Sequence, residues 1–131
     1  RRSAGSPGPY LLQAAIAACH ATSPTYDATD WREIAELYRL LAARSPSPVV
    51  SLNRAVAVAE RDGPAAGLRL VDAIDGLEHF HLWHATRADL LRRLGRGVES
   101  AAAYRAALEC EPSAAERRFL DRRLAEVSAT L

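Results

Sequence analysis

Three histidines and a tryptophan lie close together in the segment HFHLWH, residues 79–84. Imidazole is a common zinc ligand, and the side chains of His81 and His84 would share one face of a helix. A zinc site also needs a third or fourth ligand at a defined spacing, and no cysteine or carboxylate is placed locally to supply it. We therefore expect no metal here and interpret the histidines as structural or surface residues.

Nucleophilic chemistry finds equally little support in the sequence. Cys19 and His20 are neighbours, so on a helix their side chains point in different directions and do not form a catalytic pair. The glycines lack the strand-then-helix context of a phosphate-binding loop, and no serine has a base and an orienting acid nearby. We expect no catalytic residue and no cofactor. The two cysteines, the second being Cys110, both fall in helix-like segments, which favours a reduced, cytoplasmic protein.

Four arginines in the segment RRFLDRR, residues 117–123, suggest a nucleic-acid surface at first sight. The acids Glu116, Asp121 and Glu126 interleave with them at helical spacing, however, and this pattern is typical of surface charges that pair with one another. The net charge of the chain is only +1, which does not indicate a dedicated nucleic-acid surface. No apolar run approaches the roughly 18 residues that a membrane span requires.

Along the whole chain, apolar residues recur at intervals near the 3.6-residue period of an α-helix, and nothing indicates a strand. Asp30 or Thr29 is expected to cap a helix, Pro48 suits the first turn of another, and Gly95 suits the position just after a helix end. Seven helices are predicted, separated by breaks at residues 22–30, 45–48, 62–64, 75–76, 95 and 112.

Small residues recur at one spacing and indicate how these helices pack. Gly67 follows Ala55 by twelve residues, and Ser100 follows Ala88 by the same interval. Two helices approach closely only where both present small side chains. Residues 91–112 accordingly resemble the second half of a tetratricopeptide (TPR) repeat, whose period is about 34 residues.

These spacings predict a single all-α, TPR-like helical-repeat domain, an α-α superhelix of about three helical hairpins and a C-terminal capping helix. A generic helical bundle is the alternative. The predicted repeat units cover about residues 9–44, 48–76 and 81–112, and the capping helix covers about residues 113–129.

Longer phrases carry a more specific resemblance. GPYLLQAAIAACHA (8–21), SPVVSLNRAVAVAERDGPAAGL (47–68) and ERRFLDRRLA (116–125) resemble the C-terminal extension of certain bacterial extracytoplasmic-function RNA polymerase sigma factors. The resemblance implies a TPR-like regulatory domain that follows the sigma domains, which would lie before Arg1. It also implies protein partners: those sigma domains, RNA polymerase core or a regulator. No helix-turn-helix pattern or basic, aromatic-rich region points to direct nucleic-acid contact.

A TPR array presents a concave groove, lined by the first helix of each hairpin, that binds segments of other proteins. Aligning the small residues places polar side chains in two equivalent rows along this groove. Terminal-carboxylate capture is not indicated, because the lysines and asparagines of such clamps are missing apart from Asn53. The predicted groove residues are Gln13, Asn53 and Thr86 in one row, His20, Glu60 and Arg93 in the other, and Asp89 between them.

The sequence thus favours a non-catalytic domain that takes part in transcription initiation through protein contacts. The chain begins with Arg1 and contains no methionine, so we expect it to belong to a longer protein. A free-standing peptide-binding adaptor unrelated to transcription is the alternative. A small metal-dependent or hydrolytic enzyme would require acids or ligands that converge in a pocket.

Overall fold

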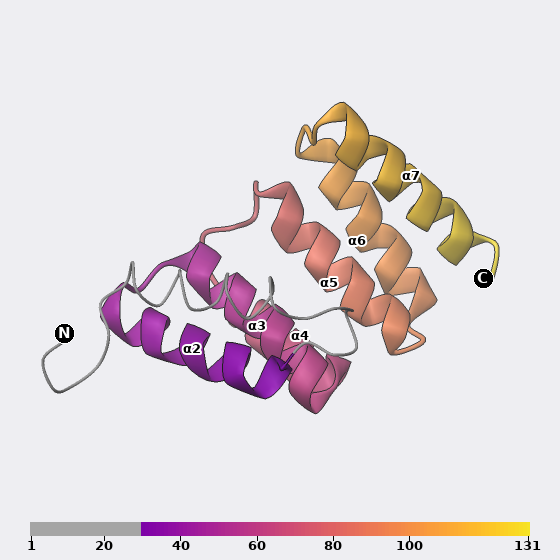
Figure 1. Ribbon diagram of the computed structural model, residues 1–131. Coiled ribbons are helices and arrows are strands. Elements are labelled where there is room, and N and C mark those ends of the chain that lie inside the picture. The colour runs from indigo at the N-terminus through magenta and orange to yellow at the C-terminus, as the bar shows by residue number, and fades with distance from the viewer. Residues whose placement is uncertain (1–29) are drawn as a thin grey trace, which may run out of the picture.

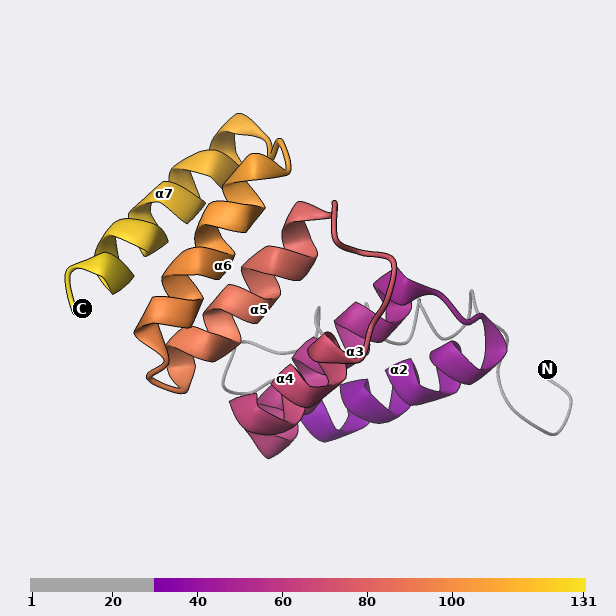
Figure 2. The same ribbon diagram turned by 180° about the vertical axis from the view of Figure 1, so that it is seen from behind.

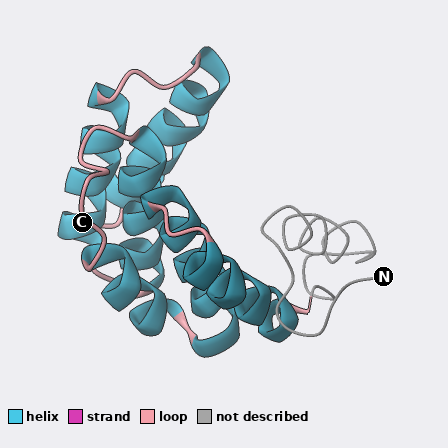
Figure 3. Ribbon diagram, turned by 90° about the vertical axis from the view of Figure 1, so that its left-hand side faces the viewer, coloured by secondary structure: helices cyan, strands magenta, loops and turns pink. Residues whose placement is uncertain are grey.

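The computed structural model describes residues 30–131, and this part of the chain contains six α-helices and no strand (Figures 1 and 3). The all-α prediction is therefore confirmed for the described residues. The region predicted as the first helix lies outside them. The helices are α2 (Trp31–Arg44), α3 (Pro48–Asp62), α4 (Pro64–Asp72), α5 (His81–Arg93), α6 (Gly97–Glu109) and α7 (Ala114–Ser128).

Side-chain caps explain where several helices begin. The Asp30 carboxylate accepts a hydrogen bond from a backbone N–H in the first turn of α2, and Ser47 does the same for α3, whose first residue is Pro48. Ser113 and Glu116 form a reciprocal capping box at the start of α7. Each cap satisfies an N–H group that has no partner within its helix, so the boundaries follow from local sequence.

The described helices pack in chain order, and some helices that are not consecutive also touch. Each helix from α2 to α7 packs against the next one, while α3 also contacts α5. Figure 1 and the reverse view in Figure 2 show α5, α6 and α7 side by side, with α3 and α5 running in the same general direction. The first helices of two successive hairpins, α3–α4 and α5–α6, are thereby neighbours.

Both predicted small-residue contacts are present. A Cβ atom added to Gly67 would lie 3.0 Å from the carbonyl oxygen of Ala55 and within overlap distance of the Ala59 side chain. The Ser100 hydroxyl donates a 2.8 Å hydrogen bond to the carbonyl oxygen of Ala88 and is fully buried. These residues therefore bring the two helices of each hairpin close together.

Two groups of buried side chains form the core. The larger group runs from α3 to α7 and includes Leu91 and Tyr104, which are 0% and 1% exposed. The smaller one joins α2 to α3 through residues such as Ile34 and Val58. Because α3 contributes to both groups, it connects α2 to the rest of the stack. No helix within residues 30–131 is long and apolar enough to cross a membrane.

Candidate functional site

A pocket of about 270 Å³ lies between α3, α5 and α7. Four of the seven predicted groove residues line it: Glu60 from α3, and Thr86, Asp89 and Arg93 from α5. The structure thus brings these four predicted residues together along one pocket. Asn53 is half-buried on α3 but does not line the pocket. Gln13 and His20 lie outside the described residues.

A second pocket, also of about 270 Å³, adjoins the first at Ala85 and Phe119. Its walls are mostly apolar and come from the first half of α5 and the first half of α7. We call the two pockets together the α3–α5–α7 groove. The second pocket is lined by the apolar residues Leu82, Ala85, Phe119 and Leu120, and also by His81 and Glu116.

Ion pairs occupy the end of the groove where α3 and α5 terminate. Arg93 Nη1 lies 2.8 Å from Glu60 Oε2 and 3.7 Å from Asp89 Oδ2. Arg92 Nη2 lies 2.6 Å from Asp89 Oδ1. The Glu60 side chain is only 13% exposed, so its pair with Arg93 is shielded from water more than an ordinary surface pair. The Glu60–Arg93 pair links α3 to α5, and both acids at this end of the groove have an arginine partner.

Tyr104 of α6 lines the first pocket of the groove, and the residue is almost completely buried. Burial raises the pKa of the Tyr104 phenol, and the Arg92 guanidinium acts in the opposite direction. A phenol with a raised pKa stays protonated at neutral pH. Tyr104 is therefore a packing residue with a polar tip, as its place on the apolar stripe predicted.

Exposed apolar side chains occupy the other end of the groove. Leu82 is 43% exposed and Phe119 is 44% exposed, and both line the second pocket. The guanidinium carbons of Arg122 and Arg123 lie 5.7 Å and 5.4 Å from the centroid of the Phe119 ring, a distance at which cation–π attraction operates. The groove therefore has an apolar end and a charged end.

Leu82 and Phe119 were not predicted as groove residues. The apolar stripe of the last helix runs through Leu120, Leu124 and Val127, and Phe119 lies beside that stripe rather than on it. A large aromatic residue displaced from the packing face was the available signal. An exposed aromatic of this kind often marks a contact surface.

Glu116 joins the beginnings of α5 and α7. One carboxylate oxygen accepts the Ser113 backbone N–H at 2.8 Å, and the other lies 2.9 Å from Nε2 of His81. Hydrogen bonding from the Ser113 backbone and then from His81 lowers the pKa of Glu116 to about 2. The prediction that this acid pairs with an arginine of its own helix is wrong, because the capping geometry turns it toward α5. Glu126 does pair with Arg123, at 3.1 Å.

Two further residues of the histidine-rich segment, Trp83 and His84, contact backbone groups of the preceding residues. Trp83 Nε1 donates a 3.1 Å hydrogen bond to the carbonyl oxygen of Val71. His84 Nε2 lies 2.7 Å from the carbonyl oxygen of Glu78, which Cys110 Sγ also approaches to 3.9 Å. Within the described residues, no three His, Cys, Asp or Glu side chains are arranged to hold a metal ion. This segment fixes the connection between α4 and α5.

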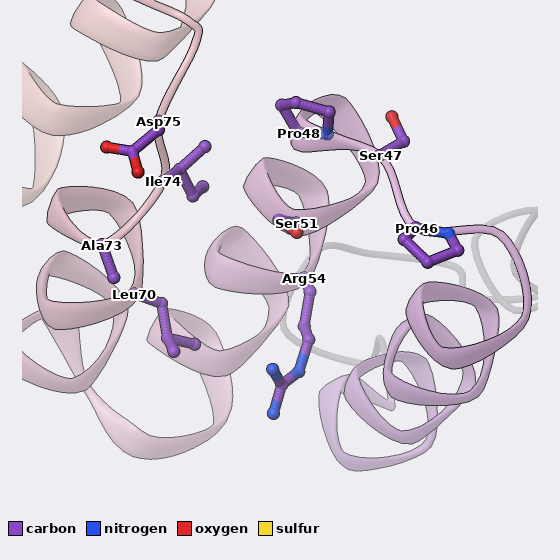
Figure 4. Close-up of a pocket in the computed structure, with 9 residues that line it drawn as sticks. All are labelled: Pro46, Ser47, Pro48, Ser51, Arg54, Leu70, Ala73, Ile74 and Asp75. Atoms are coloured by element: carbon purple, nitrogen blue, oxygen red, sulfur yellow. The ribbon is translucent and has the colours of Figure 1, made fainter.

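Another pocket, of about 460 Å³, lies between the α2–α3 loop and the end of α4 (Figure 4). Pro46 and Pro48 stand on one side of it, and Ile74 and Asp75 on the other. Arg54 of α3 extends between the helices and does not point toward Asp75 in this view. None of the predicted groove residues lines this pocket, and its polar groups do not converge on a common point.

Comparison with known proteins gives one clear similarity. A protein of Rhizobium meliloti (strain 1021), itself described as uncharacterized, is 43% identical to this chain over 124 residues. The alignment covers 94% of this chain and 29% of the relative, so the chain spans less than a third of that protein's length. No family model matches the chain, and no solved structure matches it.

Proposed function

We propose that the chain is a TPR-like domain of a bacterial extracytoplasmic-function sigma factor, and that it binds protein rather than catalysing a reaction. In this proposal it acts in the cytoplasm during transcription initiation. Its partners are its own sigma domains, RNA polymerase core or a regulator. The observation that carries the proposal is the α3–α5–α7 groove, in which side chains from three helices far apart in the sequence converge.

The helix contacts support the repeat architecture. The Ala55–Gly67 and Ala88–Ser100 contacts have the same spacing in successive hairpins, and α3 contacts α5. A solenoid requires both features, because each repeat packs internally at small residues and externally against the corresponding helix of its neighbour. In a generic bundle, nothing would make these contacts recur at one interval.

The chemistry of the groove supports binding over catalysis. Glu60 and Asp89 each form an ion pair with an arginine, so both carboxylates are already engaged by side chains of the protein itself. A general acid or base instead needs a side chain that can reach the reacting proton of a substrate. The adjoining apolar pocket, with Leu82 and Phe119 partly exposed, is the kind of surface that receives side chains of another protein.

The link to transcription rests on the resemblance of phrases such as residues 47–68 to the sigma-factor extension. The length of the Rhizobium meliloti relative is compatible with it, since most of that protein lies outside the aligned region. A domain that serves a sigma factor needs such additional parts.

A transcription assay reconstituted from core polymerase and the sigma factor tests this function. We expect deletion of the segment corresponding to residues 30–131 to reduce transcription from the sigma factor's own promoters at least several-fold. A deletion variant that transcribes these promoters as fully as the intact protein would contradict the proposal. If no sigma domain is joined to this chain, the free-standing peptide-binding adaptor becomes the better account.

A further inference from the structure

We propose that the apolar end of the α3–α5–α7 groove recognises a protein segment that carries a large apolar side chain next to a carboxylate. This inference rests on the proposed binding role of the groove and adds the chemistry of the partner. The partner's apolar side chain would enter the pocket between Leu82, Ala85 and Phe119, and its carboxylate would meet Arg122.

The second pocket exposes two large apolar side chains. Leu82 and Phe119 project from different helices, and each leaves over two fifths of its surface exposed. They face the same hollow. An apolar side chain inserted there would remove both from water in a single step, and burial of such surface is the main driving force for association.

Most charged side chains near the groove already have an ion-pair partner. Glu60, Asp89 and Glu116 contact Arg93, Arg92 and His81, respectively. Arg123 pairs with Glu126. Among the described residues, no carboxylate lies within ion-pair distance of Arg122, whose close contact is the Phe119 ring. Arg122, beside Phe119 at the edge of the groove, is therefore a cation that is open to an acid from outside.

The direction of the helices favours the same sign of charge. The second pocket lies at the beginnings of α5 and α7, where helix dipoles present partial positive charge. Phe80, the N-cap residue of α5, supplies no side-chain hydrogen bond to that end. Glu116 already occupies the N-terminus of α7, so the free positive charge comes from Arg122 and the N-terminus of α5. A basic segment would meet these two groups of like sign, whereas an acidic segment is attracted by them.

Selection from a random twelve-residue peptide library displayed on phage, with the 131-residue chain as bait, tests the inference. We expect the enriched peptides to combine Leu, Phe or Trp with a nearby Glu or Asp, and to carry net negative charge. The affinity of an enriched peptide should fall roughly tenfold or more in Phe119→Ala and in Leu82→Ala, since each removes most of a buried apolar contact.

A charge exchange then tests the role of Arg122. Arg122→Glu should lower the affinity for the acidic peptide by about threefold to tenfold. Replacing the acid of the peptide by Lys should restore binding to this variant. Val98→Ala and Arg105→Glu are matched controls, because Val98 is 71% exposed and both residues lie on α6, away from the groove. They should leave the affinity unchanged. Circular dichroism verifies that every variant retains its helix content.

The outcomes separate this inference from the proposed function. Peptides that depend on Phe119 but are basic or neutral would overturn the inference while supporting a binding groove. Failure to obtain any peptide that depends on Phe119 or Leu82 would overturn both.

Discussion

Gly67 shows how much a single position decides in this chain. A methyl group there would approach the Cβ atom of Ala59 within overlap distance and the backbone oxygen of Ala55 to 3.0 Å. Neither of these atoms can rotate away, so α3 and α4 would have to separate. The small residue is therefore required by the packing of the hairpin rather than by the backbone conformation.

We expect Gly67→Ala to lower the free energy of unfolding by about 1–2 kcal/mol. Overpacking costs about 1–3 kcal/mol, and the better helix propensity of alanine recovers up to about 1 kcal/mol of it. Urea denaturation measures the difference. Gly97→Ala is the matched control, because a Cβ there would meet the end of the flexible Leu131 side chain, and its effect should be near zero. Equal stabilities of wild type and Gly67→Ala would contradict the observed packing.

Individual groove residues were predictable to the extent that helical spacing defines a face. Glu60 and Arg93, 33 residues apart, were assigned to one row and form a 2.8 Å ion pair. The contact of Glu116 with His81 was not predictable, because spacing within one helix does not reveal which side chain another helix places opposite. Phe119 was missed for a related reason, since its importance comes from the neighbouring Leu82.

At the scale of elements, Glu116 both caps α7 and connects it to α5. Its pKa of about 2 lies below the ordinary value of 4.5, so the folded state favours the ionised carboxylate. The stability that this group contributes is complete above the unfolded pKa and is lost as the pH falls from about 4.5 toward 2. Acidification should therefore loosen the beginnings of both helices.

We expect Glu116→Gln to be less stable than wild type at pH 7, and the difference to shrink as the pH is lowered from 4.5 to 2. Urea denaturation at pH 7, 4 and 2.5 provides the comparison. Glu109→Gln, at an exposed glutamate of α6, should show no such convergence. A stability difference that stays constant over this range would mean that the ionised carboxylate makes no special contribution.

Element boundaries were the most predictable feature, because caps and breakers act locally. Asp30, Pro48 and Gly95 take the roles that their residue types predicted. The seventh helix, predicted over about residues 113–129, spans Ala114–Ser128 with Ser113 as its cap. The small-residue spacing added tertiary information, since it correctly predicted two contacts between helices.

At the scale of the whole molecule, the described helices stack in chain order, and the α3–α5–α7 groove between them has an apolar end and a charged end. The all-α architecture followed from hydrophobic periodicity. The repeat architecture and the sigma-factor role are proposals. The spacing of residues predicts which neighbouring helices touch, but it does not predict which protein binds to them. The groove is the feature through which both proposals can be tested.

Site-specific photo-crosslinking tests the central claim most directly. A benzophenone amino acid is placed at Thr86, in the groove, and the intact protein that contains this chain is irradiated together with RNA polymerase. Arg105 on α6 provides the control position. We predict crosslinks to a sigma domain, a polymerase subunit or a regulator from position 86, and few or none from position 105. Equal crosslinking from both positions, or none from position 86 in an actively transcribing complex, would contradict a protein-binding groove.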